Sequence, residues 1–442
     1  MGAGLAAAAP GTPPLAFDLT RGGIWLTSES TGTVTHLQST TGRADAAVTV
    51  PGAVGHRLSV LRNGPDLLVC DVDAGLLHLI EPQRLAPARA ATLRPGTTVT
   101  AANGVVYPVD GASGRVQRLD GRLLTGLGPV VDLGGALGAV AQSVDGTLWV
   151  PVRTSGSVVM IRDGVASPPI PVARPDHQID VVLAHDRPVL VDGTAGTAIP
   201  ITGERPGRKI ALPVALTTAA AGPPSAVIAA AAVERSTVPI LDTVAGRLLL
   251  ADVHDGEVTM HDLPTQTGGG RAQPGASTAQ PGGGPAQPGG GPARTGGGGD
   301  SASTDPATAA GLPDIERPAG GDEDDRPVAP RRLGPPTWHD GAIYIPDQDA
   351  RMVWVFDTRT GGFTEPIVVP GTPPGPGTET GAAQITVTAE GDQVWVNDPA
   401  GPDAVLIDGT RRATVAKRPS GLPGQTGTTP ARPLPARLTT GP

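Results

Sequence analysis

Short β-rich runs recur along the sequence, the first five at spacings of roughly 40 residues, and this repetition restricts the fold more than any other feature. Each run follows a turn signal and is mostly apolar. The runs are 23–26, 66–69, 104–107, 146–149, 187–190, 341–344 and 392–395. An eighth, weaker run falls within 225–263, at either 238–241 or 247–250, and the pattern does not choose between these registers. The period is typical of a supersecondary unit that must stack on its neighbours to bury its apolar faces.

Aromatic residues are scarce, and half of them fall at one position of the repeat. The chain has five Trp, two Tyr and three Phe, and the shared position holds Trp25, Tyr107, Trp149, Tyr344 and Trp395. A bulky side chain that recurs on one strand fills the wedge between adjacent blades of a β-propeller. We therefore predict that these aromatics are structural. The predicted fold is all-β, a single β-propeller of about eight, alternatively seven, four-stranded blades.

Glycine and proline divide the chain into segments. The 63 Gly and 49 Pro are concentrated in two stretches that bury too little apolar surface to offset the entropy of ordering. We expect a disordered N-terminus at 1–13 and a first part of the propeller at 14–264. A disordered Gly/Pro-rich insertion at 265–328 precedes the last two blades, at 329–418. A disordered Pro-rich tail follows at 419–442.

Charge and cysteine content exclude several classes of partner. The net charge of -9 and the pI of about 5.4 disfavour phosphate backbones, so we expect no nucleic-acid partner. Cys70 is the one cysteine; it excludes an intramolecular disulfide and lies in an apolar run where a buried thiol is expected. We expect no membrane-spanning helix. The first residues, MGAGLAAAAPG, are similar to the end of a signal peptide or anchor, so a leader upstream of Met1 is our hypothesis.

Two longer units resemble known propeller repeats. VWVFDTRTGGFTEPIVVPG and LWVPVRTSGSVVMIRDGVASPPIPV are similar to NHL/YncE-like and quinoprotein-like repeats. The order of the units resembles actinobacterial extracytoplasmic propellers, which carry an N-terminal anchor, a Pro-rich linker and often fibronectin type III domains. The resemblance covers 14–264 and 329–418. It implies an extracytoplasmic or cell-surface location, with a cytoplasmic location as the alternative, and it implies no activity.

No motif in the sequence assigns a catalytic, cofactor-binding or metal-ligating residue. The pairs Asp71/Asp73, Asp252/Asp255 and Asp347/Asp349 fit turns in which the carboxylate binds nearby backbone N–H groups, although a calcium site is the alternative interpretation. No HExxH or CxxC is present. Ser113, Ser155 and Ser157 lie in hairpin turns and not in a nucleophile elbow. We therefore expect no cofactor.

Three functions remain open. The first is a non-enzymatic, monomeric binding module that takes a protein or a cell-wall polymer through its face loops, with membrane contact only through an anchor absent from this chain. The second is a propeller enzyme, either a metal-dependent lactonase-like hydrolase or a quinone-dependent dehydrogenase. The third is a purely structural domain of a larger assembly. Convergent carboxylates in the channel would favour the second.

Overall fold

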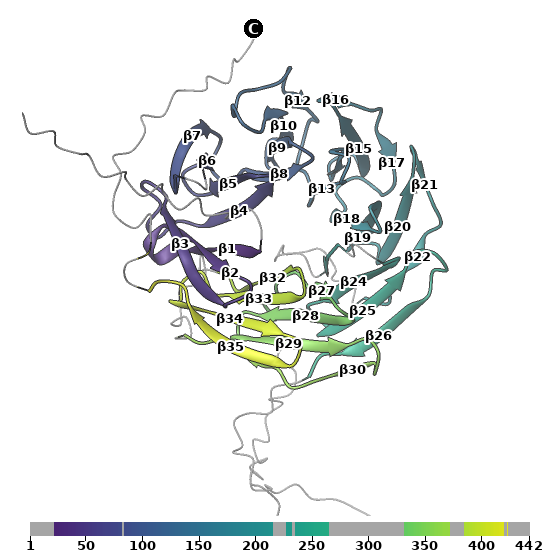
Figure 1. Ribbon diagram of the computed structural model, residues 1–442. Coiled ribbons are helices and arrows are strands. Elements are labelled where there is room, and N and C mark those ends of the chain that lie inside the picture. The colour runs from purple at the N-terminus through teal and green to yellow at the C-terminus, as the bar shows by residue number, and fades with distance from the viewer. Residues whose placement is uncertain are drawn as a thin grey trace, which may run out of the picture. The chain divides into compact units, whose positions relative to one another are not determined.

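The computed structural model describes residues 22–81, 84–214, 227–231, 235–264, 331–371, 384–419 and 422. In these residues the regular structure is β-strand, apart from one short 3-10 helix, η1 (Glu29–Thr31). The strands form eight sheets, which follow one another around a common axis (Figure 1). This confirms the predicted all-β propeller and gives eight blades in place of the alternative seven.

The first four blades contain β1 to β17. Blade 1 has β1 (Gly23–Ser28), β2 (Thr33–Gln38) and β3 (Arg43–Thr49). Blade 2 has β4 (Leu58–Asn63), β5 (Asp66–Asp71), β6 (Leu76–Glu81) and β7 (Ala86–Thr92). Blade 3 has β8 (Thr98–Ala102), β9 (Val105–Asp110), β10 (Arg115–Val116), β11 (Leu119–Asp120) and β12 (Val131–Asp132). Blade 4 has β13 (Ala141–Gln142), β14 (Leu148–Val152), β15 (Ser157–Arg162), β16 (Val165–Ala166) and β17 (Ile170–Pro171).

The last four blades contain β18 to β35. Blade 5 has β18 (Ile179–Ala184), β19 (Arg187–Asp192), β20 (Thr197–Thr202), β21 (Arg205–Pro206) and β22 (Ile210–Ala211). Blade 6 has β23 (Val227–Ala229), β24 (Thr237–Asp242), β25 (Arg247–Asp252) and β26 (Val258–Asp262). Blade 7 has β27 (Thr337–His339), β28 (Ala342–Asp347), β29 (Met352–Asp357), β30 (Gly362–Phe363) and β31 (Ile367–Val368). Blade 8 has β32 (Thr386–Glu390), β33 (Gln393–Asn397), β34 (Asp403–Asp408) and β35 (Arg411–Ala416).

Each blade is an antiparallel meander whose first strand lies nearest the axis (Figure 1). Several outer positions hold two short strands in place of one, as β21 and β22 do beside β20. Blade 1 departs from the predicted four strands, since its described sheet is β1-β2-β3. The undecided eighth repeat is also settled, because 238–241 lies in β24, the second strand of blade 6, and 247–250 lies in the third strand, β25.

In blades 2 to 8 the second strand is buried along most of its length because neighbouring blades cover both of its faces, and in blade 1 the strand buried in this way is β1. In β5 the run Leu67–Cys70 is buried along its whole length, as expected of a strand that carries a continuous apolar sequence. Cys70 is among these residues, and burial raises the pKa of its thiol to about 12. The thiol is therefore held in its protonated, unreactive form.

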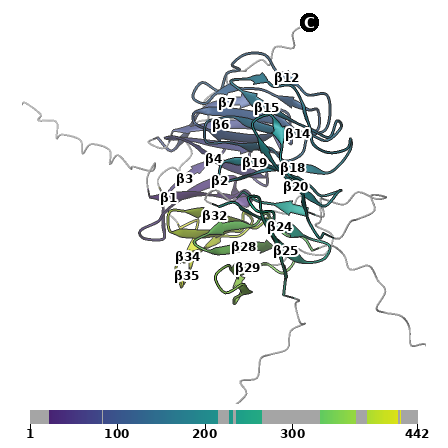
Figure 2. The ribbon, with the colours of Figure 1, turned by 90° about the vertical axis from the view of Figure 1, so that its right-hand side faces the viewer.

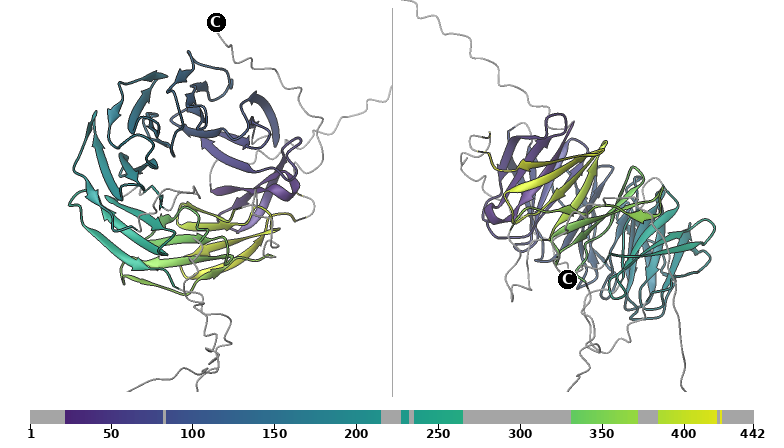
Figure 3. Two further views of the ribbon diagram at one scale, coloured as in Figure 1. Left: turned by 180° about the vertical axis from the view of Figure 1, so that it is seen from behind. Right: turned by 90° about the horizontal axis from the view of Figure 1, so that it is seen from below.

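The ring closes by packing the last blade against the first. Strand β3 contacts β35, and Figures 2 and 3 show blade 8 beside blade 1 from two further directions. One apolar cluster joins Trp395 of β33 to Ile24 and Leu26 of β1. This cluster is the packing that holds the two ends of the ring together.

The segments predicted to be disordered lie outside the described residues, apart from 419 and 422. The insertion predicted at 265–328 lies between blade 6 and blade 7, the first of the last two blades. Among the described residues, no helix is long and apolar enough to cross a membrane.

Candidate functional site

Equivalent turns between the second and third strands line one face of the propeller, which we call the turn face. The turns are 28–32, 71–75, 110–114, 152–156, 192–196, 242–246, 347–351 and 397–401. Most begin with an Asp whose carboxylate accepts a hydrogen bond from a backbone N–H three residues later. The distance is 2.9 Å from Ala74 N to Asp71 and 3.0 Å from Ala350 N to Asp347. These carboxylates therefore shape the turns themselves.

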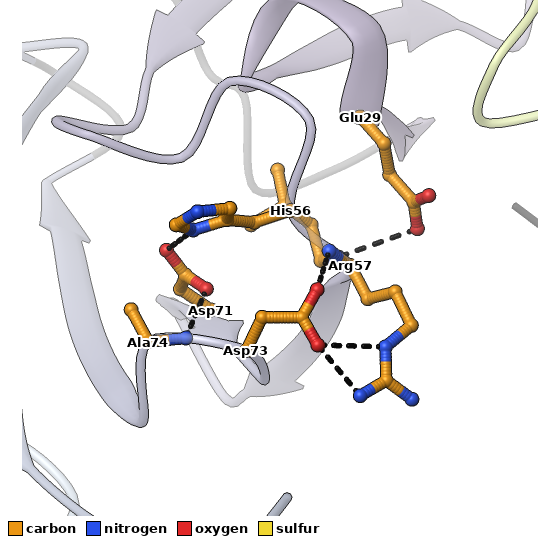
Figure 4. Close-up of polar contacts among 7 residues, drawn as sticks. Glu29, His56, Arg57, Asp71, Asp73 and Ala74 are labelled. Carbon is orange, nitrogen blue, oxygen red and sulfur yellow. Dashed lines mark hydrogen bonds and ion pairs between the residues drawn. The ribbon is translucent and has the colours of Figure 1, made fainter. Parts of the chain in front are cut away.

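The same buried carboxylates pair with a cationic or imidazole side chain from the connection that enters the blade. His56 Nδ1 lies 2.8 Å from Asp71, as Figure 4 shows. The equivalent pairs are His177 with Asp192 at 2.8 Å, Arg94 with Asp110 at 2.9 Å, and Arg331 with Asp347 at 2.6 Å. Hydrogen bonding to Asp71 raises the pKa of His56. Because the pairing recurs in four blades, it belongs to the repeat.

Blade 2 holds a second ion pair beside the first, between Arg57 and Asp73. Arg57 donates to Asp73 through its backbone N, at 2.8 Å, and through its guanidinium, at 2.8 and 2.6 Å (Figure 4). This bond to Arg57 lowers the pKa of the Asp73 carboxyl. Blade 7 repeats the arrangement, with Arg332 and Asp349 joined at 3.0 Å through the backbone and at 2.7 Å through the guanidinium.

Glu29 differs from the groups that repeat. It opens η1 in blade 1, is half-buried, and accepts a hydrogen bond from Leu58 N at 3.4 Å (Figure 4). Burial is the main cause that raises the pKa of its carboxyl, and the nearby charge of Arg57 acts in the opposite direction. Blade 1 thus contributes a carboxyl group held in a poorly hydrated position at the turn face.

These charges surround a cleft of about 460 Å³ in the inner ring. The cleft is lined by residues of β1, β4 and β32 and by four residues that we call its rim, Glu29, Arg57, Arg332 and Pro399. The size is within the range of ligand-binding clefts, roughly 300–1,000 Å³. The rim places two guanidinium groups and one carboxyl group around a single opening.

A buried lysine supports the wall of the cleft. Lys417 is fully buried and donates to Thr27 O at 3.1 Å, to Asn397 Oδ1 at 2.7 Å and to Asp398 O at 2.7 Å. Burial lowers the pKa of Lys417 to about 8. Asn397 and Thr27 line the cleft, so the ammonium group joins blade 8 to blade 1 from behind it.

The five predicted aromatics lie in β1, β9, β14, β28 and β33, each at the third residue after the turn that precedes its strand. All five are buried, and each belongs to an apolar cluster shared with the next blade. Trp25, Tyr107, Trp149, Tyr344 and Trp395 are in the clusters with Leu58, Leu148, Ile179, Val394 and Leu26, in that order. None of them except Trp25 lines the cleft.

The residues that line the cleft were missed by sequence reasoning, except for Trp25, which was predicted to be structural, whereas the Asp residues of the neighbouring turns were named. A signal exists in the five-residue turns, where D-x-x-A-G recurs at 71–75, 192–196 and 242–246. Lys417 and Lys209 are the two lysines of the chain, but nothing in the sequence around Lys417 indicates burial. Asp252 accepts from His254 N at 2.8 Å, which is again turn geometry. Among the described residues, no three His, Cys, Asp or Glu are grouped so that they could hold a metal ion.

Comparison with known proteins supports the fold. No family and no curated protein matches the sequence. Among solved structures, the chain is similar to the dihydro-heme d1 dehydrogenase NirN, with 12% identity, a TM-score of 0.57, and coverage of 92% of this chain and 76% of that chain. It is also similar to virginiamycin B lyase from Staphylococcus aureus, with 10% identity, a TM-score of 0.48, and coverage of 86% and 95%. A third is AztD from Citrobacter koseri, with 14% identity, a TM-score of 0.43, and coverage of 79% and 95%. The similarity to NirN supports the propeller fold alone and does not bear on activity.

Proposed function

We propose that this chain is a non-enzymatic binding or scaffold module of the cell surface, which engages a protein or a cell-wall polymer through its turn face. The observation that carries the proposal is the group of charged rim residues Glu29, Arg57 and Arg332, because the partners of the two arginines, Asp73 and Asp349, lie in turns of the turn face. Exposed guanidinium groups beside a carboxyl group suit a polar partner with charges of both signs.

The repeated ion pairs support a binding role over an enzymatic one. A His–Asp pair such as His56–Asp71, in which the carboxylate is buried, would otherwise be a candidate for general base chemistry. The equivalent position holds arginine in blades 3 and 7, as Arg94 and Arg331. An arginine cannot accept a proton, so the conserved geometry of this position serves the fold.

The proposed location rests on the sequence resemblance to actinobacterial surface propellers and on the Gly/Pro-rich segments. In this proposal the chain acts as a monomer outside the cytoplasm. The net charge of the chain, -9, supports a partner other than nucleic acid.

The test measures retention on a purified cell-wall fraction and on immobilised surface-protein extract. The double variant Arg57→Glu/Arg332→Glu reverses both rim guanidinium groups, and we expect it to bind at least ~10-fold more weakly than the wild type because rim charges become repulsive. Both arginines are exposed, with side-chain exposures of 52% and 44%. Loss of their surface ion pairs is therefore expected to cost ~1 kcal/mol or less in stability for each pair.

The matched control is Arg122→Glu. Arg122 is 74% exposed and pairs with Asp66 at 3.2 Å beside the turns of the opposite face. Wild-type binding that survives in Arg122→Glu and is lost in the double variant supports the proposal. Absence of wild-type binding in both assays, or equal loss in the two variants, contradicts it.

A further inference from the structure

The inner edge of β1 has no partner strand among the described residues. Seven of the eight sheets begin with an inner strand, namely β4, β8, β13, β18, β23, β27 and β32. In blade 1 the sheet begins with β1. The last pair before the turn that follows β1 is Ser28 with Thr33, and the equivalent pair in blade 2, before the turn that follows β5, is Asp71 with Leu76. Strand β1 therefore corresponds to β5, a second strand. The position of the inner strand of blade 1 is the cleft.

Side chains bind two backbone carbonyl groups along this edge. Ser39 N donates to Gly22 O at 2.7 Å, so the backbone groups of Gly22, Ile24 and Leu26 point toward β2 and those of the alternate residues point inward. Inward-pointing Gly23 O accepts from the Arg62 guanidinium, and Thr27 O accepts from Lys417 at 3.1 Å. An open strand edge of this kind is a template for another strand.

We propose that the inner edge of β1 is the docking site of residues 15–20 of this same chain. These residues lie outside the described part of the chain and precede β1 by the length of one tight turn. Elsewhere, β8 joins β9 and β27 joins β28 through two residues. The second of these two residues is a glycine with φ of 75°, at Gly104 and at Gly341. Gly22 has a φ of 78° and stands at the equivalent position, as a two-residue hairpin turn requires.

The sequence of the segment has the alternation of an inner strand. In β18, Ile179, Val181 and Leu183 alternate on the face that packs against blade 4. Val387 and Ala389 of β32, with Ile385 just before the strand, do the same against blade 7. Counting back from the turn, the same three positions of the segment 15–20 are Leu15, Phe17 and Leu19. A strand with this pattern would place its apolar residues toward blade 8.

Charge complementarity gives an independent argument. Arg62 occupies the position of β4 that Leu183 holds in β18 and Ala389 in β32, so it is a charge on a face that is otherwise apolar. That face is turned toward blade 1. Arg62 now contacts Glu390 of β32 at 3.0 Å as well as Gly23 O. Asp18 lies on the polar side of the segment, which would face β4, and supplies a carboxylate for Arg62.

Hydrogen exchange of the full chain tests the proposal through peptides that cover 23–28. We compare the wild type with Phe17→Asp, which puts a charge on the apolar side of the segment, and with Thr12→Asp, which adds the same charge outside it. Docking predicts that exchange of the Trp25 and Thr27 amides becomes at least tenfold faster in Phe17→Asp and does not change in Thr12→Asp. Equal exchange in all three proteins overturns the proposal.

A charge reversal separates docking from a general loss of folding. Asp18→Arg should speed exchange in 23–28, and Asp18→Arg combined with Arg62→Asp should restore slow exchange because the pair is re-formed with opposite signs. Failure of the double variant to restore protection overturns the predicted pairing. Protection that varies with protein concentration also overturns it, because a second copy would then be the occupant.

Discussion

Lys417 shows how a single side chain can join the two ends of a ring. It is the last residue before the chain leaves blade 8, and its ammonium group reaches a carbonyl of blade 1. Its three acceptors among the described residues are two backbone carbonyls and one amide oxygen. Desolvation of the buried ammonium group is the main cause that lowers its pKa, and the nearby charge of Asp398 acts in the opposite direction.

The lowered pKa predicts how stability depends on pH. Between about pH 8, the pKa of Lys417 in the folded protein, and 10.5, its ordinary value, the unfolded chain keeps a proton that the folded protein has released. The free energy of unfolding contributed by Lys417 therefore rises across this window, by up to ~3 kcal/mol. The measurement is urea denaturation of the wild type and of Lys417→Met at several pH values. A difference between the two that stays constant from pH 7 to 10.5 would refute the prediction.

At the residue scale, the sequence predicts the role of side chains that recur at one position of the repeat, and it does not predict contacts that occur once. Trp25 and Trp149 stand out because a scarce residue type returns at a fixed position. Lys417 acts on Thr27, which lies at the other end of the chain. No local pattern can encode that contact, because the ring closure that creates it depends on all eight blades.

At the element scale, the turns of the turn face carry information that strand patterns do not. Their leading Asp orders the turn and also binds the connection that enters the blade, as Asp71 does with Ala74 N and His56. Aligning turns as well as strands would have given the D-x-x-A-G motif from sequence. The partner of each Asp lies 15 or 16 residues earlier, a separation that becomes meaningful only when the strand lengths are known.

Two glycines with similar backbone angles test the packing of these turns. Gly75 closes a turn with φ of 66°, and a Cβ there would lie 2.7 Å from Leu93 O. Gly64 has φ of 62° and no heavy atom within 4 Å of such a Cβ. We expect Gly64→Ala to cost ~1 kcal/mol through backbone strain alone. Gly75→Ala should cost ~2 kcal/mol more because the neighbouring backbone must move.

The measurement is the shift in urea midpoint at constant slope for the two alanine variants. Equal shifts would show that the turn at 71–75 is not held against the connection that follows β7. A larger effect at Gly64 would contradict the packing of the turn outright.

At the scale of the whole molecule, the repeat predicts the ring, but it does not settle the register of blade 6 and does not predict the three-stranded sheet described for blade 1. The blade count follows from the period, and the weak sixth blade is settled only by pairing, since β24 and β25 have equally apolar sequences. Among the described residues blade 1 has no inner strand, and the cleft beside β1 was not predicted from the sequence. The repeated runs begin at 23, so the pattern does not predict an inner strand for this blade.

The central claim is that blade 8 packs on blade 1 and closes the ring. A double-mutant cycle between Trp395 and Leu26, which share the cluster at this boundary, tests it most directly. Trp395→Ala and Leu26→Ala should each destabilise by roughly 2–5 kcal/mol. Closure predicts a coupling energy of ~1 kcal/mol or more between them, whereas additivity within ~0.5 kcal/mol would mean that the two side chains are not in contact and that the ring is open.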